Sequence, residues 1–203
     1  IIDDEGSLTY RELDQRTDRM AGELRARGVL EGGAVGLLAR NGRGFVEGSV
    51  AISKCGADVL YLNTGSAGPL LAEVLHREGA VAVLHDVEFA ELLAPSGPGK
   101  VMVTTEELTA LAVTSTREAP PKTGHVTRLV IHTSGTTGAP RGAARSGASI
   151  DDAASLLSRI PLRAGERTFI ASPVFHSWGL GHLTMAMLLG STVVLHKKFD
   201  PAR

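Results

Sequence analysis

Hydrophobic positions near the start of the chain recur first at helical and then at strand spacing. After Thr9, apolar or small residues recur every three or four positions, and Glu12 stands at the spacing of a capping box. The buried stripe of this expected helix consists of Leu13, Thr17, Met20, Ala21 and Leu24. The pattern predicts that the helix ends at Gly28 and that a strand follows over residues 34–39.

Helical and strand patterns alternate along the rest of the chain. Further helices are predicted up to residue 56 and over residues 69–79, 89–93, 106–112, 150–159 and 180–189. Further strands are predicted over residues 58–62, 81–84, 101–103, 127–132, 168–171 and 192–196. This alternation is typical of mostly parallel sheets with flanking helices, so we expect an α/β fold.

Composition narrows the class of protein. The 203 residues are 43% hydrophobic and carry a formal net charge of −1, as in an ordinary globular chain. The single cysteine, Cys55, excludes an internal disulfide, and we interpret it as a small buried thiol, because no His or Asp stands at motif spacing to it. No long apolar run or secretion signal is present. We therefore expect a cytoplasmic protein with no nucleic acid among its partners.

The candidate chemistry follows the apolar residues 129–131. Residues 133–142 have the sequence Thr-Ser-Gly-Thr-Thr-Gly-Ala-Pro-Arg-Gly. Glycines such as Gly135 and Gly138 let the backbone approach an anion closely, and successive hydroxyl groups and amides can bind its oxygens. Arg141 adds a planar cation that can bind phosphate through two parallel hydrogen bonds. The composition therefore predicts a phosphate-binding loop.

A cluster of Gly and Thr also occurs in ordinary flexible turns, and local charge favours the phosphate interpretation. Residues 119–150 contain Lys122, Arg128, Arg141 and Arg145 but no Asp or Glu. The segment is not the P-loop of nucleoside triphosphatases, because that motif ends in Gly-Lys and Ser or Thr, whereas Pro140, Arg141 and Gly142 stand here. For Arg145, a phosphate contact and a solvated surface charge are both open, and we favour the surface charge.

Residues 133–142 resemble the signature of the adenylate-forming enzymes, which include acyl-CoA synthetases, luciferases and the adenylation domains of peptide synthetases. Nine of the ten positions match, and Arg141 replaces the usual Lys. Many members have a His a few residues later, where this chain has Ser146 or Gly147. The resemblance implies that ATP phosphates are bound by Thr133, Ser134, Gly135, Thr136, Thr137, Gly138 and Arg141. It also implies a contact between Thr136 and Mg²⁺.

A second segment, residues 172–181, resembles the Pro-x-Phe-His-x-x-Gly sequence that lines the carboxylate pocket of acyl-CoA synthetases. The resemblance implies an acyl pocket formed by Phe175, His176, Trp178 and Gly179, with His176 as the catalytic hydrogen-bond donor to the acyl carboxylate. A satisfied core histidine is the alternative for His176, and core filling is an equal alternative for Trp178. Peptide synthetases usually have Phe-Asp here, so the segment favours the acyl-CoA branch.

The resemblance extends over nearly the whole chain, although enzymes of this family are typically more than twice as long. The chain lacks the Tyr-Gly-x-Thr-Glu and Thr-Gly-Asp segments and the small domain with its catalytic lysine. We expect an incomplete large N-terminal domain with a first α/β subdomain at 1–113, a linker at 114–124, and a second α/β segment at 125–203. The second segment would carry the phosphate loop and be truncated at Asp200 and Pro201, which predict the start of another helix.

The resemblance implies part of an ATP-dependent acyl-CoA synthetase that acts on a fatty or other apolar carboxylic acid. The full enzyme would use ATP, Mg²⁺ and coenzyme A, whereas this fragment alone is expected to be inactive. Its expected partners are the small-molecule acid and the missing C-terminal part, and any membrane contact would occur only through a lipid substrate. The alternative is a non-catalytic half-domain that serves as a binding or dimerisation module, with a second copy covering an open sheet edge.

Overall fold

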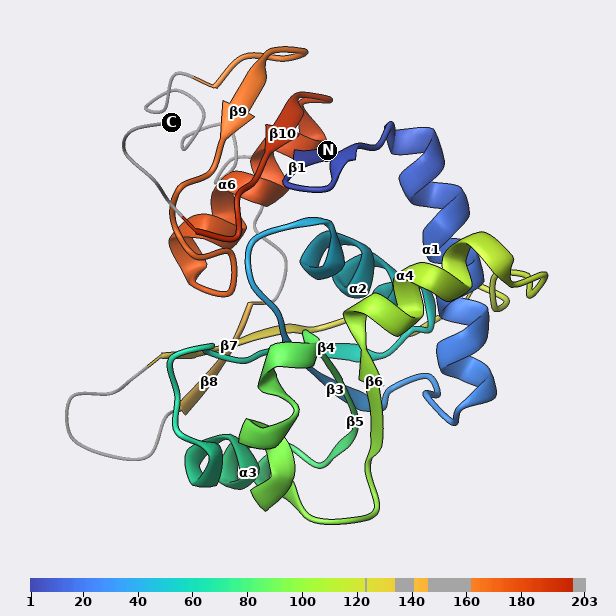
Figure 1. The fold of residues 1–203 in the computed structure, drawn as a ribbon, viewed down its shortest axis with the longest axis vertical. Helices are drawn as coiled ribbons and strands as arrows, with labels where there is room; N and C mark the ends of the chain where they lie inside the picture. Colours follow the sequence, from blue (N-terminus) through green and yellow to red (C-terminus); the bar gives the residue numbers. More distant parts are fainter. Residues whose placement is uncertain (123, 134–140, 146–161, 199–203) are drawn as a thin grey trace.

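The computed structural model describes residues 1–122, 124–133, 141–145 and 162–198, and their strands form two sheets (Figure 1). The large sheet has the order β6-β5-β3-β4-β7-β8, and the small sheet has the order β2-β1-β10-β9. The large sheet contains β3 (Ala34–Leu38), β4 (Asp58–Tyr61), β5 (Ala80–His85), β6 (Val101–Thr104), β7 (Leu129–Thr133) and β8 (Arg141–Arg145). The small sheet contains β1 (Ile2–Asp3), β2 (Gly6–Ser7), β9 (Arg167–Phe169) and β10 (Thr192–Val194).

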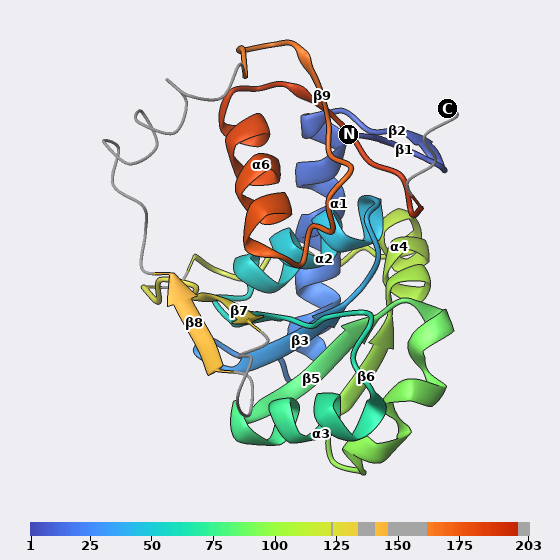
Figure 2. The same ribbon diagram turned by 90° about the vertical axis from the view of Figure 1, so that its left-hand side faces the viewer.

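Helices lie on both faces of the large sheet (Figure 2). The helices are α1 (Tyr10–Ala26), α2 (Arg43–Lys54), α3 (Gly68–Arg77), α4 (Thr105–Thr114) and α6 (Ser177–Leu188), with 3-10 turns η1 (Val87–Phe89) and η2 (Glu91–Ser96). α1, α2 and α4 pack on one face of the large sheet, and α3 with η2 packs on the other. α6 packs against β10 of the small sheet. The result is the predicted α/β architecture with mostly parallel strands.

The first helix shows how local sequence produces this architecture. Thr9 is the N-cap of α1, its hydroxyl accepts the backbone N–H of Glu12, and the Glu12 carboxylate accepts the backbone N–H of Thr9. The buried residues of the helix are Leu13, Thr17, Met20, Ala21 and Leu24, which confirms the predicted stripe. The chain leaves the helix through Gly28, whose φ of 95° is strained for other residues.

Strand β3 lies at the centre of the large sheet, and its side chains alternate between two cores. Val35 and Leu37 pack with the core formed with α1 and α2, whereas Leu38 packs with the core under α3. All three side chains are fully buried. A central parallel strand covered on both faces explains why the sequence of β3 is apolar at almost every position.

The structure differs from the predicted elements in several places. The predicted helix 89–93 consists of the 3-10 turns η1 and η2, and Pro95 lies within the second turn. α6 begins at Ser177, three residues before the predicted start. The hairpin of β1 and β2 and the strand β8 were not predicted. The predicted helix 150–159 and the residues Asp200 and Pro201 lie outside the described residues.

The strand pairing crosses the expected division at residues 114–124. β7 and β8 join the large sheet, although they follow this segment, and β1 pairs in parallel with β10 from the other end of the chain. The division into 1–113 and 125–203 remains a prediction about folding units.

Within the described ranges, no helix is both long enough and apolar enough to span a membrane.

Candidate functional site

The two ends of the predicted phosphate loop meet at the carboxyl end of β7. In the antiparallel pair of β7 and β8, Thr133 is the register partner of Arg141. The five residues Ser134, Gly135, Thr136, Thr137 and Gly138 belong to the connection between these strands and lie outside the described residues. The backbone therefore brings the first and last predicted phosphate ligands to one point, at the edge where α/β sheets bind ligands.

The same register separates Arg145 from that point. Arg145 pairs with Leu129 at the opposite end of β7, four residues along the strand from Arg141. At about 3.4 Å per residue, this places the two arginine backbones about 14 Å apart. The backbone therefore places Arg141, and not Arg145, beside the predicted loop, and the surface-charge interpretation of Arg145 stays a prediction.

A buried carboxylate fixes the entry to β7. Asp58 at the start of β4 is 1% exposed and accepts hydrogen bonds from the backbone N–H of Arg128 at 2.9 Å and from its Nε at 2.8 Å. His125 Nε2 lies 2.9 Å from the same carboxylate. Burial acts to raise the pKa of Asp58, but the hydrogen bonds from Arg128 and His125 outweigh burial and lower it. This charged cluster anchors the strand that leads into the predicted phosphate loop.

His176 lies at the start of α6, on a tight turn. Its backbone N–H donates to the carbonyl of Pro173 at 3.2 Å, and the residue itself is the N-cap of the helix. The imidazole is exposed and packs against Phe175, with the ring centroids 4.5 Å apart. Phe175 is buried, as is Gly179, which lies directly against the Pro173 carbonyl. The predicted acyl-pocket residues Phe175, His176 and Gly179 are therefore neighbours at the start of α6.

The remaining candidates divide between surface and core. Trp178 is 62% exposed, lies edge-on to His182 with ring centroids 4.5 Å apart, and is not part of the described core. Cys55 is fully buried, and its Sγ lies 3.4 Å from the Ala21 carbonyl oxygen as a hydrogen-bond donor. Burial raises the pKa of Cys55 to about 11. The interpretation of Cys55 as a small buried thiol is confirmed.

Sequence reasoning gave no role to Asn41, which the structure places beside the turn of His176. Asn41 follows β3, is 8% exposed, and donates from Nδ2 to the carbonyl of Ser172 at 2.9 Å. Its Oδ1 accepts the backbone N–H of Val174 at 2.9 Å. The available signal was an amide residue in the short loop that follows the apolar strand β3, because a buried amide requires hydrogen-bond partners.

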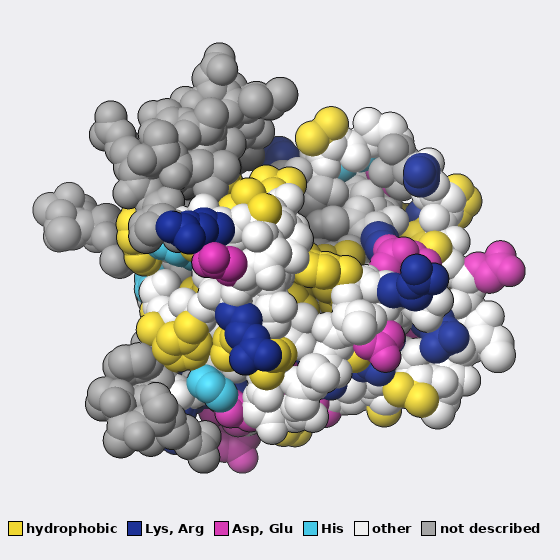
Figure 3. Space-filling model, turned by 90° about the horizontal axis from the view of Figure 1, so that it is seen from above, with side chains coloured by type: hydrophobic (Ala, Val, Ile, Leu, Met, Phe, Trp, Pro, Cys, Tyr) yellow, Lys and Arg dark blue, Asp and Glu magenta, His cyan; other side chains and the backbone are white. Residues whose placement is uncertain are grey.

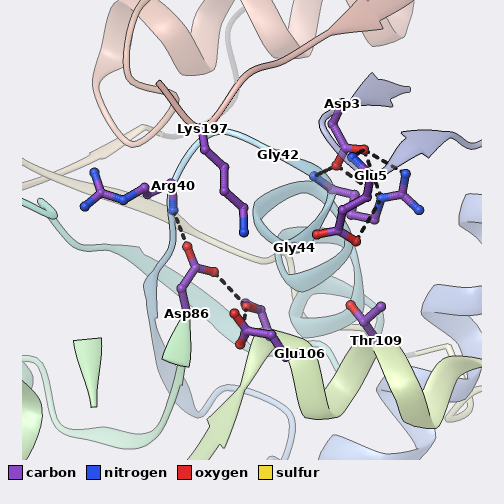
Figure 4. Close-up of a pocket in the computed structure, with 11 residues that line it drawn as sticks. Asp3, Glu5, Arg40, Gly42, Gly44, Asp86, Glu106, Thr109 and Lys197 are labelled. Atoms are coloured by element: carbon purple, nitrogen blue, oxygen red, sulfur yellow. Dashed lines mark hydrogen bonds and ion pairs between the residues drawn. The ribbon is translucent and has the colours of Figure 1, made fainter. Parts of the chain in front are cut away.

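A polar cavity of about 170 Å³ lies where the two sheets approach each other (Figure 4). Arg43 binds Asp3 through Nη2 at 2.7 Å, and the side chain of Lys197 extends toward the cavity from the small-sheet side. Burial raises the pKa of Asp86, although the backbone N–H of Arg40 and the hydroxyl of Thr105 donate to it. We assign these walls to joining the sheets, because Arg43 of α2 forms ion pairs with Asp3 and Glu5 from the small-sheet side.

A second cavity, of about 340 Å³, lies between α2, β7 and α6. Its walls include Val46, Val50, Leu129, Leu180, Leu183 and Met187. None of the predicted site residues lines it.

Within the described part of the chain, no three His, Cys, Asp or Glu residues are grouped to hold a metal ion. On the face seen from above, positive and negative side chains of the described residues lie interspersed (Figure 3).

The loop flanks thus stand at the carboxyl end of β7, and the His176 turn lies between β9 and α6 of the same α/β fold. The sequence profile of the AMP-binding enzymes matches residues 1–203. The chain therefore belongs to the AMP-binding, or adenylate-forming, enzyme family and corresponds to its N-terminal part.

Curated relatives are similar over nearly all of this chain. A feruloyl-CoA synthase from an Amycolatopsis species is 35% identical over 198 residues, which cover 96% of this chain and 40% of the relative. An indoleacetate–CoA ligase from Aromatoleum aromaticum is 32% identical, with 97% of this chain and 41% of the relative covered. The chain spans about 40% of the length of these relatives.

Solved structures have the same fold. The N-terminal domain of FACL13 from Mycobacterium tuberculosis superposes with a TM-score of 0.85 at 25% identity, covering 98% of this chain and 53% of that one. The Bacillus subtilis o-succinylbenzoate CoA synthetase, solved with an acyl-adenylate intermediate, gives a TM-score of 0.83 at 26% identity, with 98% and 41% covered. The predicted fold class is confirmed.

Proposed function

We propose that the chain is part of an acyl-CoA synthetase that activates an apolar carboxylic acid with ATP and transfers the acyl group to coenzyme A. The observation that carries the proposal is the register pairing of Thr133 with Arg141, which brings both ends of the phosphate loop to the carboxyl end of β7. The exposed His176 at the N-terminus of α6 supplies the second half of the site. Family membership supports the assignment of both segments.

The first step joins two anions. A carboxylate oxygen of the acid attacks the α-phosphorus of ATP, a new P–O bond forms, and the bond to pyrophosphate breaks. In this proposal the loop, from Thr133 to Gly138, and Arg141 bind the β- and γ-phosphate oxygens and stabilise the charge on the leaving pyrophosphate. His176 donates a hydrogen bond to the acid carboxylate and orients it for attack. In the second step the thiol of coenzyme A attacks the acyl carbon, and AMP leaves.

The donor set of the loop fits ATP with Mg²⁺. Hydroxyl oxygens are hard donors of the kind that Mg²⁺ accepts beside phosphate, and we assign this contact to Thr136. Bound Mg²⁺ would neutralise phosphate charge. Arg141 in place of the usual Lys keeps the positive charge and adds a planar pair of donors.

The acid is proposed to be apolar, aromatic or fatty. Phe175 is buried under His176, and Trp178 presents an exposed aromatic face two residues further on. Both rings can contact an apolar acyl group next to the carboxylate. The relatives named for feruloyl and indoleacetate substrates favour an aromatic acid as the first to be tested.

The test uses the longest polypeptide that the coding sequence specifies around this chain. ATP–pyrophosphate exchange is measured with ferulate, indoleacetate and a series of fatty acids, with wild-type protein and the Arg141→Ala variant. We expect acid-dependent exchange from the wild type and a strong loss in the variant. A folded polypeptide without exchange for any acid would overturn the proposal and favour the half-domain module, and sedimentation would then show whether it dimerises.

A further inference from the structure

Asn41 makes the hydrogen bonds that join the loop after β3 to the segment before α6. Its Nδ2 group donates to the carbonyls of Ser172 at 2.9 Å and Ile170 at 3.4 Å, and its Oδ1 accepts from Val174 at 2.9 Å. The side-chain amide therefore uses both of its N–H bonds and its oxygen on three backbone groups. These groups lie about 130 residues away in the sequence and alternate along one extended stretch.

The loop that carries Asn41 is itself fixed on both sides. The backbone N–H of Arg40 donates to Asp86 Oδ2 at 2.8 Å, and the backbone N–H of Arg43 donates to Asp3 Oδ2 at 2.8 Å (Figure 4). Asp86 follows β5 in the large sheet, whereas Asp3 belongs to β1 in the small sheet. Asn41 consequently projects from a short loop that is tied to both sheets.

The contacts continue directly to His176. Val174, which donates to Asn41, is the second residue of the turn in which Pro173 accepts the backbone N–H of His176. Val174 is fully buried, so the turn cannot shift without moving core side chains. A displacement of Asn41 would therefore change the position of the His176 backbone.

We propose that Asn41 is a positioning residue that sets where His176 stands relative to the large sheet and the carboxyl end of β7. This inference rests on the proposed function of His176 and deepens it. β3 lies beside β4, which in turn pairs with β7, so the large sheet that presents the loop also carries Asn41. The hydrogen bonds of the Asn41 amide hold the His176 turn in a fixed position relative to that sheet, and in the proposed function this turn orients the acid carboxylate.

The structural test uses the single tryptophan of the chain, Trp178, which stands two residues after His176. Asn41→Asp keeps the shape of the side chain but directs carboxylate oxygen at the carbonyls of Ile170 and Ser172. Asn41→Ser is too short to reach the backbone groups of Ile170, Ser172 and Val174, and it adds no charge. It is used for the test if Asn41→Asp does not fold. The matched control is Thr17→Val, a change of similar shape at another buried polar residue, whose hydroxyl donates to the Leu13 carbonyl within α1.

Fluorescence anisotropy and acrylamide quenching of Trp178 are measured on folded protein. We expect both Asn41 variants to alter the Trp178 signals, whereas Thr17→Val leaves them at wild-type values. Unchanged Trp178 signals in a folded Asn41 variant would overturn the proposal. This readout needs no turnover, so it judges the role of Asn41 even if the proposed activity fails.

The second readout is kinetic and uses the extended polypeptide. We expect kcat for pyrophosphate exchange to fall by about tenfold or more in the Asn41 variants, because a small misplacement of a reacting group has a large effect on rate. The KM for ATP should stay within about twofold, since the loop itself is not altered. Equal losses in Asn41→Ser and Thr17→Val, or a loss confined to the KM for ATP, would overturn the positioning role.

Discussion

Gly179 lies so close to the backbone carbonyl of Pro173 that a β-carbon at residue 179 would overlap the carbonyl oxygen and carbon. The contact closes the turn that carries His176, because the same carbonyl accepts the His176 N–H. The first turn of α6 therefore requires glycine at this position for steric reasons, independent of any bound substrate.

Gly179→Ala should destabilise the protein and displace the turn. We expect a loss of about 1–3 kcal/mol in the free energy of unfolding, the usual cost of forcing extra atoms into a packed site. Gly181→Ala in the same helix is the control, because a β-carbon there meets nothing within 4 Å. The control should be neutral or more stable by up to about 1 kcal/mol. Urea unfolding of both variants measures the difference, and equal stabilities would contradict the steric argument.

Asp58→Asn should weaken the protein at neutral pH but not in acid. The pKa of Asp58 is lowered in the folded state, so its charge contributes stability above the unfolded value of about 3.9. That stability is lost as the pH falls through the lower folded pKa. We expect the variant to lose about 2 kcal/mol near neutral pH, with the difference shrinking below about pH 4.

Unfolding of both proteins over a pH series checks this expectation. Asp14→Asn is the control, because Asp14 pairs with Lys54 at an exposed position and surface pairs contribute little. A pH-independent difference between wild type and Asp58→Asn would mean that packing, rather than the ion pair, anchors β7.

Cys55 should resist alkylation while the chain is folded. Its pKa is raised to about 11 by burial, so the thiolate that reacts with iodoacetamide is scarce near neutral pH, and the sulfur is also inaccessible. Mass spectrometry with and without denaturant measures the modification. Labelling of folded protein at the rate of unfolded protein would show that the core around α2 opens readily.

Arg141 and Arg145 should respond differently to substitution in the extended polypeptide. Arg141 pairs with Thr133 beside the loop, whereas Arg145 pairs with Leu129 at the far end of β8. We expect Arg141→Ala to reduce pyrophosphate exchange by about tenfold or more, because a hydrogen bond to a charged group is lost. Arg141→Lys should retain more activity, and Arg145→Ala should behave as wild type. Equal effects of the two alanine variants would remove Arg141 from the proposed phosphate site.

Much of the fold could be predicted where the determining interactions are local. The capping box of Thr9 and Glu12 and the stripe from Leu13 to Leu24 lie within one helix, so the sequence specified α1 almost to the residue. The start of α6 was missed because His176 caps the helix without a side-chain hydrogen bond. Its first turn is stabilised instead by the close contact between Gly179 and Pro173, which no helical pattern reveals.

By itself, the sequence determined the alternation of helices and strands, the buried state of Cys55 and the residue types of the two candidate segments. Only the tertiary structure decided that β1 pairs with β10, that Arg141 stands opposite Thr133, and that Asn41 binds the backbone beside Val174. The physical reason is the sequence separation over which each kind of interaction acts. Helical spacing and capping act within a few residues, whereas sheet order and buried amide contacts depend on which distant surfaces pack together.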